Sequence, residues 1–492
     1  MKLNLGASAR SLAKRLNEGR NPYILSSSLL VLGTVLVYIS PRSIPAFLLF
    51  ACAAALTYFL DMRKPVKLAM AVLIAVVIVP ILGARNIFYL EVIFQISVFA
   101  ALALGLNIVV GFSGLLNFGY MAFYAVGAYL WGFFGSQQPF LLHEIPGTAP
   151  LGTHFFMAPD FFYLFIFLGI IVAAIVGLIM GLPVLRVRGD YLAIITLGCG
   201  EIIRQLANNL DKPLNLTNGP QGITPIQRPT LPKELLAFFN RLFEPLVGHQ
   251  VTENQFYNIM FYLIAVLVVV LVVVVTFRLE DSKIGRAWAA IREDELAAQA
   301  MGIPANKLKL GAFAVGASFA GAMGVLFAAS RTFVSPESFT FLQSVGVLTM
   351  VILGGIGSIA GVIIGAAVVT VLNLQVLQSF SLFLAQLRQS DAVIPIINFH
   401  WKDLSNQIDP SKYQRLVFGI ILIIMMIYRP AGILPAARRK RELKSNGDQG
   451  DGEAPASPGD APASPGDPPA SPGDPPTSPG EADSGDKGAS RG

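Results

Sequence analysis

The segment 278–310 carries the residue pattern best suited to binding a partner protein. It is too polar to cross a membrane, and its apolar residues recur at helical spacing: Ile284, Trp288 and Ile291. One apolar stripe on an otherwise charged helix is typical of a surface helix with a single buried face. A short helix of this kind can lie in a groove of another protein and transmit that protein's movement.

A second short helix is predicted directly after the first. Arg292 to Glu295 interrupt the apolar pattern and place acidic residues at the start of a new helix, where the helix dipole favours them. Gly302 can end this helix in a left-handed turn, and Pro304 prevents its continuation. The sequence therefore predicts a helix pair on the cytoplasmic face. The alternative is an ordinary amphipathic loop that lies on the membrane surface.

Glu201 and Arg204 stand out as charges within the apolar segment 191–207. Their i, i+3 spacing allows them to pair with each other on a helix. Such a pair can be a structural element in the wall of a cavity, or it can take part in gating or substrate binding. The sequence leaves both interpretations open.

Motifs for several other kinds of chemistry are absent. No Gly-x-x-x-x-Gly-Lys-Ser/Thr loop occurs, so the chain itself is not expected to hydrolyse ATP or to be an enzyme. Gly355, Gly357 and Ala360 fit Gly-x-Gly-x-x-Ala, but they lie between apolar segments and do not follow a strand. The two cysteines, Cys52 and Cys199, are far apart and have no metal-binding spacing. We expect no cofactor and no metal on this chain.

The composition indicates an integral membrane protein. Of 492 residues, 54% are hydrophobic and only 13% are charged, whereas about a quarter of a soluble domain is charged. The run from Phe256 to Phe277 contains no Asp, Glu, Lys or Arg and is long enough to cross a bilayer.

We predict an all-α polytopic fold with about 10–12 transmembrane or re-entrant helices. The regular spans are predicted at 23–39, 44–60, 66–83, 88–110, 116–135, 161–184, 256–277, 308–329 and 415–429. Less regular segments are 191–207, 342–354 and 362–378, the last two flanking a glycine-rich stretch. Broken helices occur at membrane depth only where protein or a water-filled cavity surrounds them, so these segments are the better candidates for a solute pathway.

The positions of Lys and Arg predict the orientation. They gather at the N-terminus, after the second span, in 278–310 and after the last span, which places these four regions in the cytoplasm. The loop 136–160 has no Lys or Arg and is expected outside. Both termini are therefore predicted to be cytoplasmic. Because the net charge of +6 comes from these flanking clusters, we expect contact with membrane lipid and not with nucleic acid.

The C-terminal segment 445–492 repeats Pro-Ala-Ser-Pro-Gly-Asp at a seven-residue step. It has almost no apolar residues to bury and is predicted to be disordered. A tether is the simplest role, and a modified or partner-binding tail is the alternative.

Several motifs resemble those of ABC importer permeases, in particular the LivM branch. Leu296-Ala297-Ala298 with Gly302 is similar to the Glu-Ala-Ala loop of that family, which docks on the ATPase subunits, although Leu296 replaces the glutamate. The similar segments are Ala103–Gly111, Tyr120–Tyr129, Arg188–Ile194, Gly200–Arg204, Phe333–Phe339, Leu353–Ser358 and Tyr428–Gly432. The resemblance covers about residues 20–440, and 379–414 looks longer than the family pattern.

The resemblance implies a permease subunit of an ATP-driven importer for Leu, Ile and Val, working by alternating access in the bacterial cytoplasmic (inner) membrane. It implies four partners: a LivH-like second permease, two cytoplasmic ABC ATPases that bind ATP and Mg, and a periplasmic amino-acid-binding protein. The ATPase-coupling residues would be Gly285, Arg286, Trp288, Arg292, Glu293, Glu295, Ala297, Ala298 and Gly302.

The predicted domains are a basic N-terminus (1–22), an extension of three spans (23–83), a core permease domain (84–436) with the coupling loop 278–310, and the tail (437–492).

A zwitterionic amino acid needs partners for both of its charges, and discontinuous helices expose backbone groups that can serve. The candidates for the substrate pathway are Asn107, Ser113, Asn117, Tyr120, Glu201, Arg204, Thr217, Gly219, Gly354, Gly355 and Gly357. Other neutral amino acids, urea or amides are alternative substrates. An ion-coupled secondary transporter is an alternative class, and it would leave the segment 278–310 without a role.

Overall fold

The computed structural model describes residues 21–40, 43–60, 62–143, 154–185, 187, 190–231, 234, 237, 240–241, 244, 252–389, 393–394, 399–400, 413–429 and 432–434. The chain divides into two compact units, Met1–Arg441 and Glu442–Gly492, and all described residues belong to the first. Most of the predicted N-terminal segment 1–22 and all of the predicted tail lie outside the described residues.

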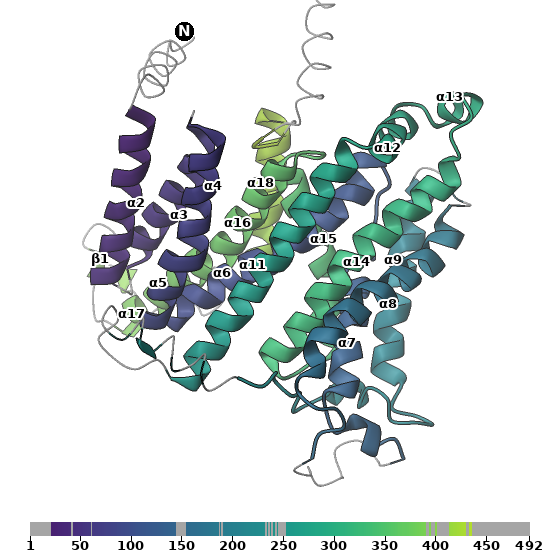
Figure 1. The fold of residues 1–492 in the computed structure, drawn as a ribbon, viewed down its shortest axis with the longest axis horizontal. Coiled ribbons are helices and arrows are strands. Elements are labelled where there is room, and N and C mark those ends of the chain that lie inside the picture. The colour runs from purple at the N-terminus through teal and green to yellow at the C-terminus, as the bar shows by residue number, and fades with distance from the viewer. Residues whose placement is uncertain are drawn as a thin grey trace, which may run out of the picture. The chain divides into compact units, whose positions relative to one another are not determined.

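The described chain is almost entirely helical (Figure 1). Its first helices are α2 (Asn21–Ile39), α3 (Ile44–Phe59), α4 (Lys64–Leu73), the π-helical η1 (Ile74–Ile78) and α5 (Val79–Arg85). They are followed by α6 (Ile87–Asn107), the π-helical η2 (Ile108–Phe112), α7 (Met121–Phe134), η3 (Gln138–Phe140), α8 (Phe161–Val184), α9 (Asp190–Asn209) and η4 (Gly219–Gln221). Next come α11 (Glu253–Glu280), α12 (Lys283–Glu293), α13 (Glu295–Ala300), α14 (Ala305–Arg331) and η5 (Pro336–Phe339). The last elements are α15 (Phe341–Gly354), α16 (Ile359–Val371), the π-helical η6 (Leu372–Leu377), α17 (Gln378–Gln389), an antiparallel pair β1 (Val393–Ile394) and β2 (Phe399–His400), and α18 (Gln414–Tyr428).

Eight helical segments among the described residues are long and apolar enough to cross a membrane. Three shorter apolar helices lie at Ile44–Thr57, Met121–Phe134 and Gly419–Tyr428. The prediction of an all-α polytopic membrane fold is confirmed.

Helices α6 and α14 form the centre of this fold. In each of them 78% of the apolar span is buried, compared with 28% in α8 and 33% in α11. α14 packs against α6, α7 and α8, while α11 and α16 pack against α6. The outer helices leave rows of large apolar side chains exposed, as lipid-facing helices do.

Small residues allow these helices to approach closely. A Cβ atom on Gly177 of α8 would lie 2.7 Å from Ala317 Cβ of α14, and one on Gly365 of α16 would lie 2.2 Å from the carbonyl oxygen of Met350. The glycine pairs Gly177/Gly181 and Gly361/Gly365, each with the small-xxx-small spacing, thus serve helix packing.

The predicted spans agree with the helices except at two places. The predicted start at residue 116 is wrong, because α7 begins only at Met121. Gly114 has a φ of +73°, and Asn117 Oδ1 accepts a hydrogen bond from Gly119 N at 2.9 Å, so the chain turns before it enters the helix. The predicted segment 362–378 is too short, since α16, η6 and α17 continue to Gln389.

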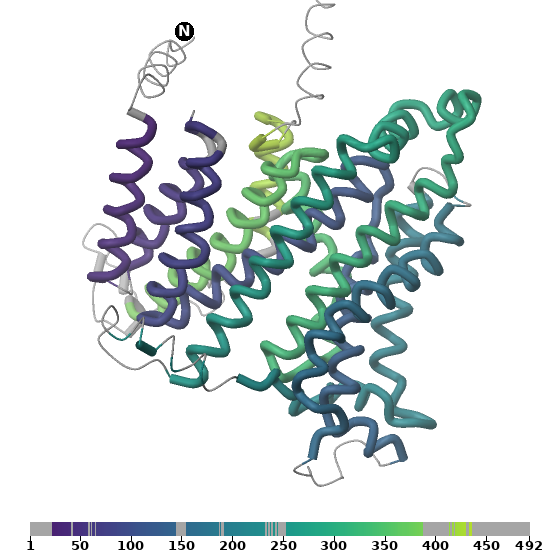
Figure 2. Tube along the Cα trace, in the orientation of Figure 1, coloured from purple at the N-terminus to yellow at the C-terminus, as the bar shows by residue number. Residues whose placement is uncertain are grey.

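The chain reverses direction at the end where α12 and α13 lie. In Figure 2 it runs along α11, passes through α12 and α13 at one end, and returns along α14. The N-terminal end of α2 lies toward the same end of this unit (Figure 1). That both regions face the cytoplasm stays a prediction.

Candidate functional site

The predicted helix pair in 278–310 is confirmed as α12 and α13. Ser282 Oγ caps α12 by accepting a hydrogen bond from Gly285 N at 3.2 Å. Asp294 Oδ1 caps α13 by accepting from Leu296 N and Ala297 N at 2.9 and 3.0 Å. Gly302 follows α13 with a φ of +83°, the left-handed turn that its position predicts. We call residues 283–300 the α12–α13 pair.

Two contacts attach the α12–α13 pair to the start of α14. Trp288 is only 1% exposed, and its indole Nε1 donates to the carbonyl oxygen of Leu308 at 2.8 Å. Lys309 Nζ lies 2.7 Å from Glu295 Oε1, with both side chains largely buried. The inner face of the pair is therefore held against the helix that continues the chain.

A third contact joins the pair to a distant part of the sequence. Arg292 Nη1, at the end of α12, donates to the carbonyl oxygen of Gly111 in η2 at 2.6 Å. At the other end of α12, Gly285 is buried against the preceding turn, where a Cβ atom would lie 2.2 Å from the carbonyl oxygen of Leu279. Helix α12 is thus fixed at both of its ends.

The outer face of the pair is open to solvent. Its exposed members include the predicted coupling residues Arg286, Glu293 and Ala297, and Gly302 directly after the pair is exposed as well. Leu296 and Met301 are 64% and 83% exposed, while Ala298 beside them is buried. This face is therefore accessible to a partner protein.

The glycine-rich turn between α15 and α16 lies against the break in α6. Gly354, Gly355 and Gly357 are all buried, and Gly357 N donates to Asn107 Oδ1 at 2.8 Å. The structure therefore brings together residues that the sequence analysis selected at two separate breaks.

The other candidates near the first break are also buried. Ser113, Asn117 and Tyr120 are no more than 2% exposed. Ser113 Oγ donates to the carbonyl oxygen of Val109 at 2.7 Å, and Tyr120 Oη donates to that of Gly316 at 2.8 Å. In this conformation they stabilise the breaks, and their contact with substrate stays a prediction.

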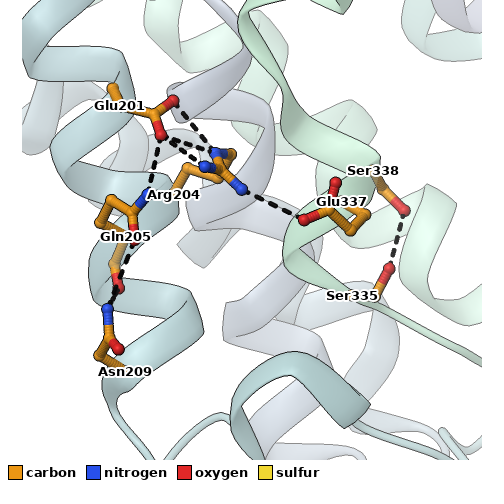
Figure 3. Close-up of polar contacts among 7 residues, drawn as sticks. All are labelled: Glu201, Arg204, Gln205, Asn209, Ser335, Glu337 and Ser338. Carbon is orange, nitrogen blue, oxygen red and sulfur yellow. Dashed lines mark hydrogen bonds and ion pairs between the residues drawn. The ribbon is translucent and has the colours of Figure 1, made fainter.

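The predicted pairing of Glu201 with Arg204 is confirmed (Figure 3). Arg204 Nε lies 3.0 Å from both carboxylate oxygens of Glu201, and Gln205 Nε2 donates to Glu201 Oε1 at 3.0 Å. Arg204 Nη1 also donates to Glu337 Oε1 of η5 at 3.2 Å. One guanidinium thus joins α9 to the segment between α14 and α15.

A small pocket adjoins this charged cluster. It is lined by Phe118, Gly119, Ala122, Leu197, Gly200, Glu201, Phe339, Phe341 and Ser344. The lining combines aromatic and aliphatic side chains with the Glu201 carboxylate and the Ser344 hydroxyl, but in this conformation the cavity, at about 10 Å³, has room for no more than a water molecule. Thr217 and Gly219 are also buried, but Gly219 lies against Asn208 and Asp211 at the far end of α9 and neither residue lines this pocket.

Removing the charge of Arg204 is expected to have a larger effect than removing that of Glu337. The Glu337 side chain is 74% exposed, and exposed ion pairs contribute about 0–1 kcal/mol. Glu337→Gln should therefore leave the melting temperature nearly unchanged, whereas Arg204→Met leaves the Glu201 carboxylate without its bidentate partner and should lower it. Thermal unfolding of the purified variants measures this, and equal melting temperatures would contradict the ranking.

Sequence reasoning missed several residues of these sites. Glu337 lies in the family-like segment Phe333–Phe339, but its pairing with Arg204 depends on the fold. In the sequence, Lys309 contributes only to the positive charge that predicts membrane orientation. Asp294 belongs to the predicted acidic start of the second helix, but its role as the helix cap was not predicted. The acceptor role of Gly111 involves only its backbone, which no residue pattern reports.

Comparison with known proteins gives consistent matches. Residues 88–426 match the family profile described as branched-chain amino acid transport system / permease component. The permease protein LivM of the high-affinity branched-chain amino acid transport system of Salmonella typhimurium is 37% identical over 392 residues, 78% of each chain. LivM of Escherichia coli is 36% identical over 72% of each chain, and Escherichia coli LivH is 22% identical over 69% of this chain and 91% of its own. No solved structure shows a significant match.

Proposed function

This chain belongs to the family of branched-chain amino acid transport permease components, and from this premise we propose that it carries Leu, Ile and Val across the membrane by alternating access. It is a multi-pass membrane protein and a permease of the ABC importer class. The α12–α13 pair carries the proposal, because it offers an exposed face to a motor protein while its inner face is bonded to the spans.

The partners follow from this assignment. A LivH-like permease would complete the pore, since LivH and this chain share the family. Two ABC ATPases would dock on the exposed face of the α12–α13 pair and bind ATP and Mg, with no cofactor on this chain. A periplasmic binding protein would deliver the amino acid from the other side. In this proposed arrangement the chain would lie in the bacterial inner membrane with both termini in the cytoplasm.

The charged cluster of α9 supports an amino-acid substrate. Opening of the Glu201–Arg204 pair during transport would free Glu201 for the amine and Arg204 for the carboxylate, and the aromatic residues beside Glu201 suit an aliphatic side chain. Other neutral amino acids, urea or amides would use the same architecture. Within the described spans the charges that an ion relay would need are paired, Glu91 with Arg331 and Glu201 with Arg204, which disfavours an ion-coupled transporter.

The class of energy source is tested by uptake of labelled leucine in cells that express the complete system. Depleting ATP should abolish uptake, while a protonophore applied at constant ATP should leave it intact. The substrate is tested by competition, in which unlabelled Ile and Val should block leucine uptake and urea should not. Loss of uptake with the protonophore alone would contradict the ATP-driven mechanism.

A further inference from the structure

Arg292 connects the α12–α13 pair to η2, an element of the membrane domain that is far from the pair in the sequence. Its Nη1 donates to the Gly111 carbonyl oxygen, 181 residues away in sequence, at 2.6 Å. Its side-chain stem lies over Gly114, where a Cβ atom would be 3.0 Å from Arg292 Cγ. The other two attachments, through Trp288 and Glu295, both lead to α14, the next helix in the chain.

The acceptor lies where α6 loses its regular form. Gly111 belongs to η2, a π-helical turn in which the last carbonyl groups lack partners within the helix. A guanidinium supplies such a carbonyl with a strong, charge-assisted hydrogen bond. Arg292 thus completes the hydrogen bonding of the break, which a neutral side chain would do less well.

The Gly111 backbone in turn lies directly on the glycine-rich turn between α15 and α16. A Cβ atom on Gly111 would lie 2.8 Å from Gly357 N and 2.2 Å from Asn107 Oδ1. Asn107 is fully buried and accepts the hydrogen bond of Gly357 N at 2.8 Å. The contacts run without interruption from Arg292 through Gly111 and Asn107 to Gly357.

We propose that Arg292 is a positioning residue that links the α12–α13 pair to the turn between α15 and α16, so that movement of α12 repositions that turn. The inference rests on the proposed function, because the movement is supplied by an ATPase docked on the pair. Without Arg292 the pair stays attached to α14 through Trp288 and Glu295. ATPase docking and hydrolysis therefore persist, and transmission to the turn is lost.

The test measures leucine uptake and ATP hydrolysis together in proteoliposomes that contain the complete transporter. Arg292→Ala should lower the leucine imported per ATP hydrolysed by about tenfold or more, with hydrolysis retained. Arg292→Lys keeps a cation and should recover part of the ratio. Lys307→Ala removes an exposed charge from the start of α14 and should keep the wild-type ratio. A wild-type ratio in Arg292→Ala would overturn the link.

Hydrogen–deuterium exchange separates this link from a merely local role of Arg292. In Arg292→Ala the peptide that covers residues 354–362 should exchange faster, because the Gly357 amide is protected through Asn107. Faster exchange confined to residues 283–300 would overturn the link. This measurement needs no substrate. A wild-type transporter that imports no leucine would therefore refute the proposed substrate, while the exchange still decides the role of Arg292.

Discussion

Trp288→Ala is expected to abolish ATP-driven uptake while the chain still inserts into the membrane. Trp288 is the largest buried side chain of the α12–α13 pair, and it anchors α12 to the carbonyl oxygen of Leu308. Truncating a buried tryptophan costs about 3–5 kcal/mol. A pair of such short helices cannot absorb that loss, because helices of this length depend on packing for their stability.

The measurement combines leucine uptake with the amount of chain in the membrane fraction. Trp288→Phe retains an aromatic ring without the Nε1 donor and should keep part of the uptake. Ile284→Ala is a control on the same helix, since Ile284 is 43% exposed and its truncation should leave the helix folded. Normal uptake by Trp288→Ala would show that the pair transmits no force through this anchor.

The helices could be predicted because the sequence features that produce them lie within the helices or directly beside them. Charge-free apolar runs such as 161–184 have to become spans, and α8 (Phe161–Val184) matches that range. The α12–α13 pair was predictable from helical spacing around Trp288 and from the end signals at Gly302 and Pro304. These signals all lie within a few residues of the structure that they specify.

The turn before α7 was not predictable from hydropathy. Leu115, Leu116 and Phe118 continue the apolar run, so the sequence favours a span from residue 116. The structure instead turns at Gly114 and caps the turn with Asn117, whose side chain accepts from Gly119 N. A single asparagine or glycine in an apolar run is also common inside helices. Only the tertiary packing decides whether such a run forms a continuous helix or a turn.

The contacts that assemble the sites were beyond sequence reasoning because they join distant residues. Tyr120 bonds to Gly316 and Arg292 to Gly111, and in both contacts the acceptor is a backbone carbonyl. Backbone acceptors are present at every residue, so residue types cannot identify which one is used. The Glu201–Arg204 pair was predictable because both partners lie on one helical turn, whereas Glu337 was not.

Gly321→Ala is expected to prevent stable folding of the whole membrane domain. Gly321 lies in the centre of α14 between two neighbouring helices. An added Cβ atom would lie 2.3 Å from the carbonyl oxygen of Gly169 and 2.4 Å from Ala173 Cβ, both on α8. On the other side, a Cβ atom on Gly127 of α7 would lie 2.0 Å from the Gly321 carbonyl oxygen, so α14 has no room to move away.

The obstacle at Gly321 is largely backbone, so rotation of a side chain cannot relieve it. Relief requires α8 and α14 to separate, and overpacking of a core already costs about 1–3 kcal/mol where side chains can adjust. Gly311→Ala is the matched control, because it lies on the same helix with no atom within 4 Å of its added Cβ. Alanine is favoured over glycine in helices by about 1 kcal/mol, so the control should be as stable as the wild type or slightly more so. Size-exclusion chromatography after heating the purified proteins measures the difference. A Gly321→Ala protein as heat-stable as Gly311→Ala would contradict the close packing of α8 against α14 at Gly321.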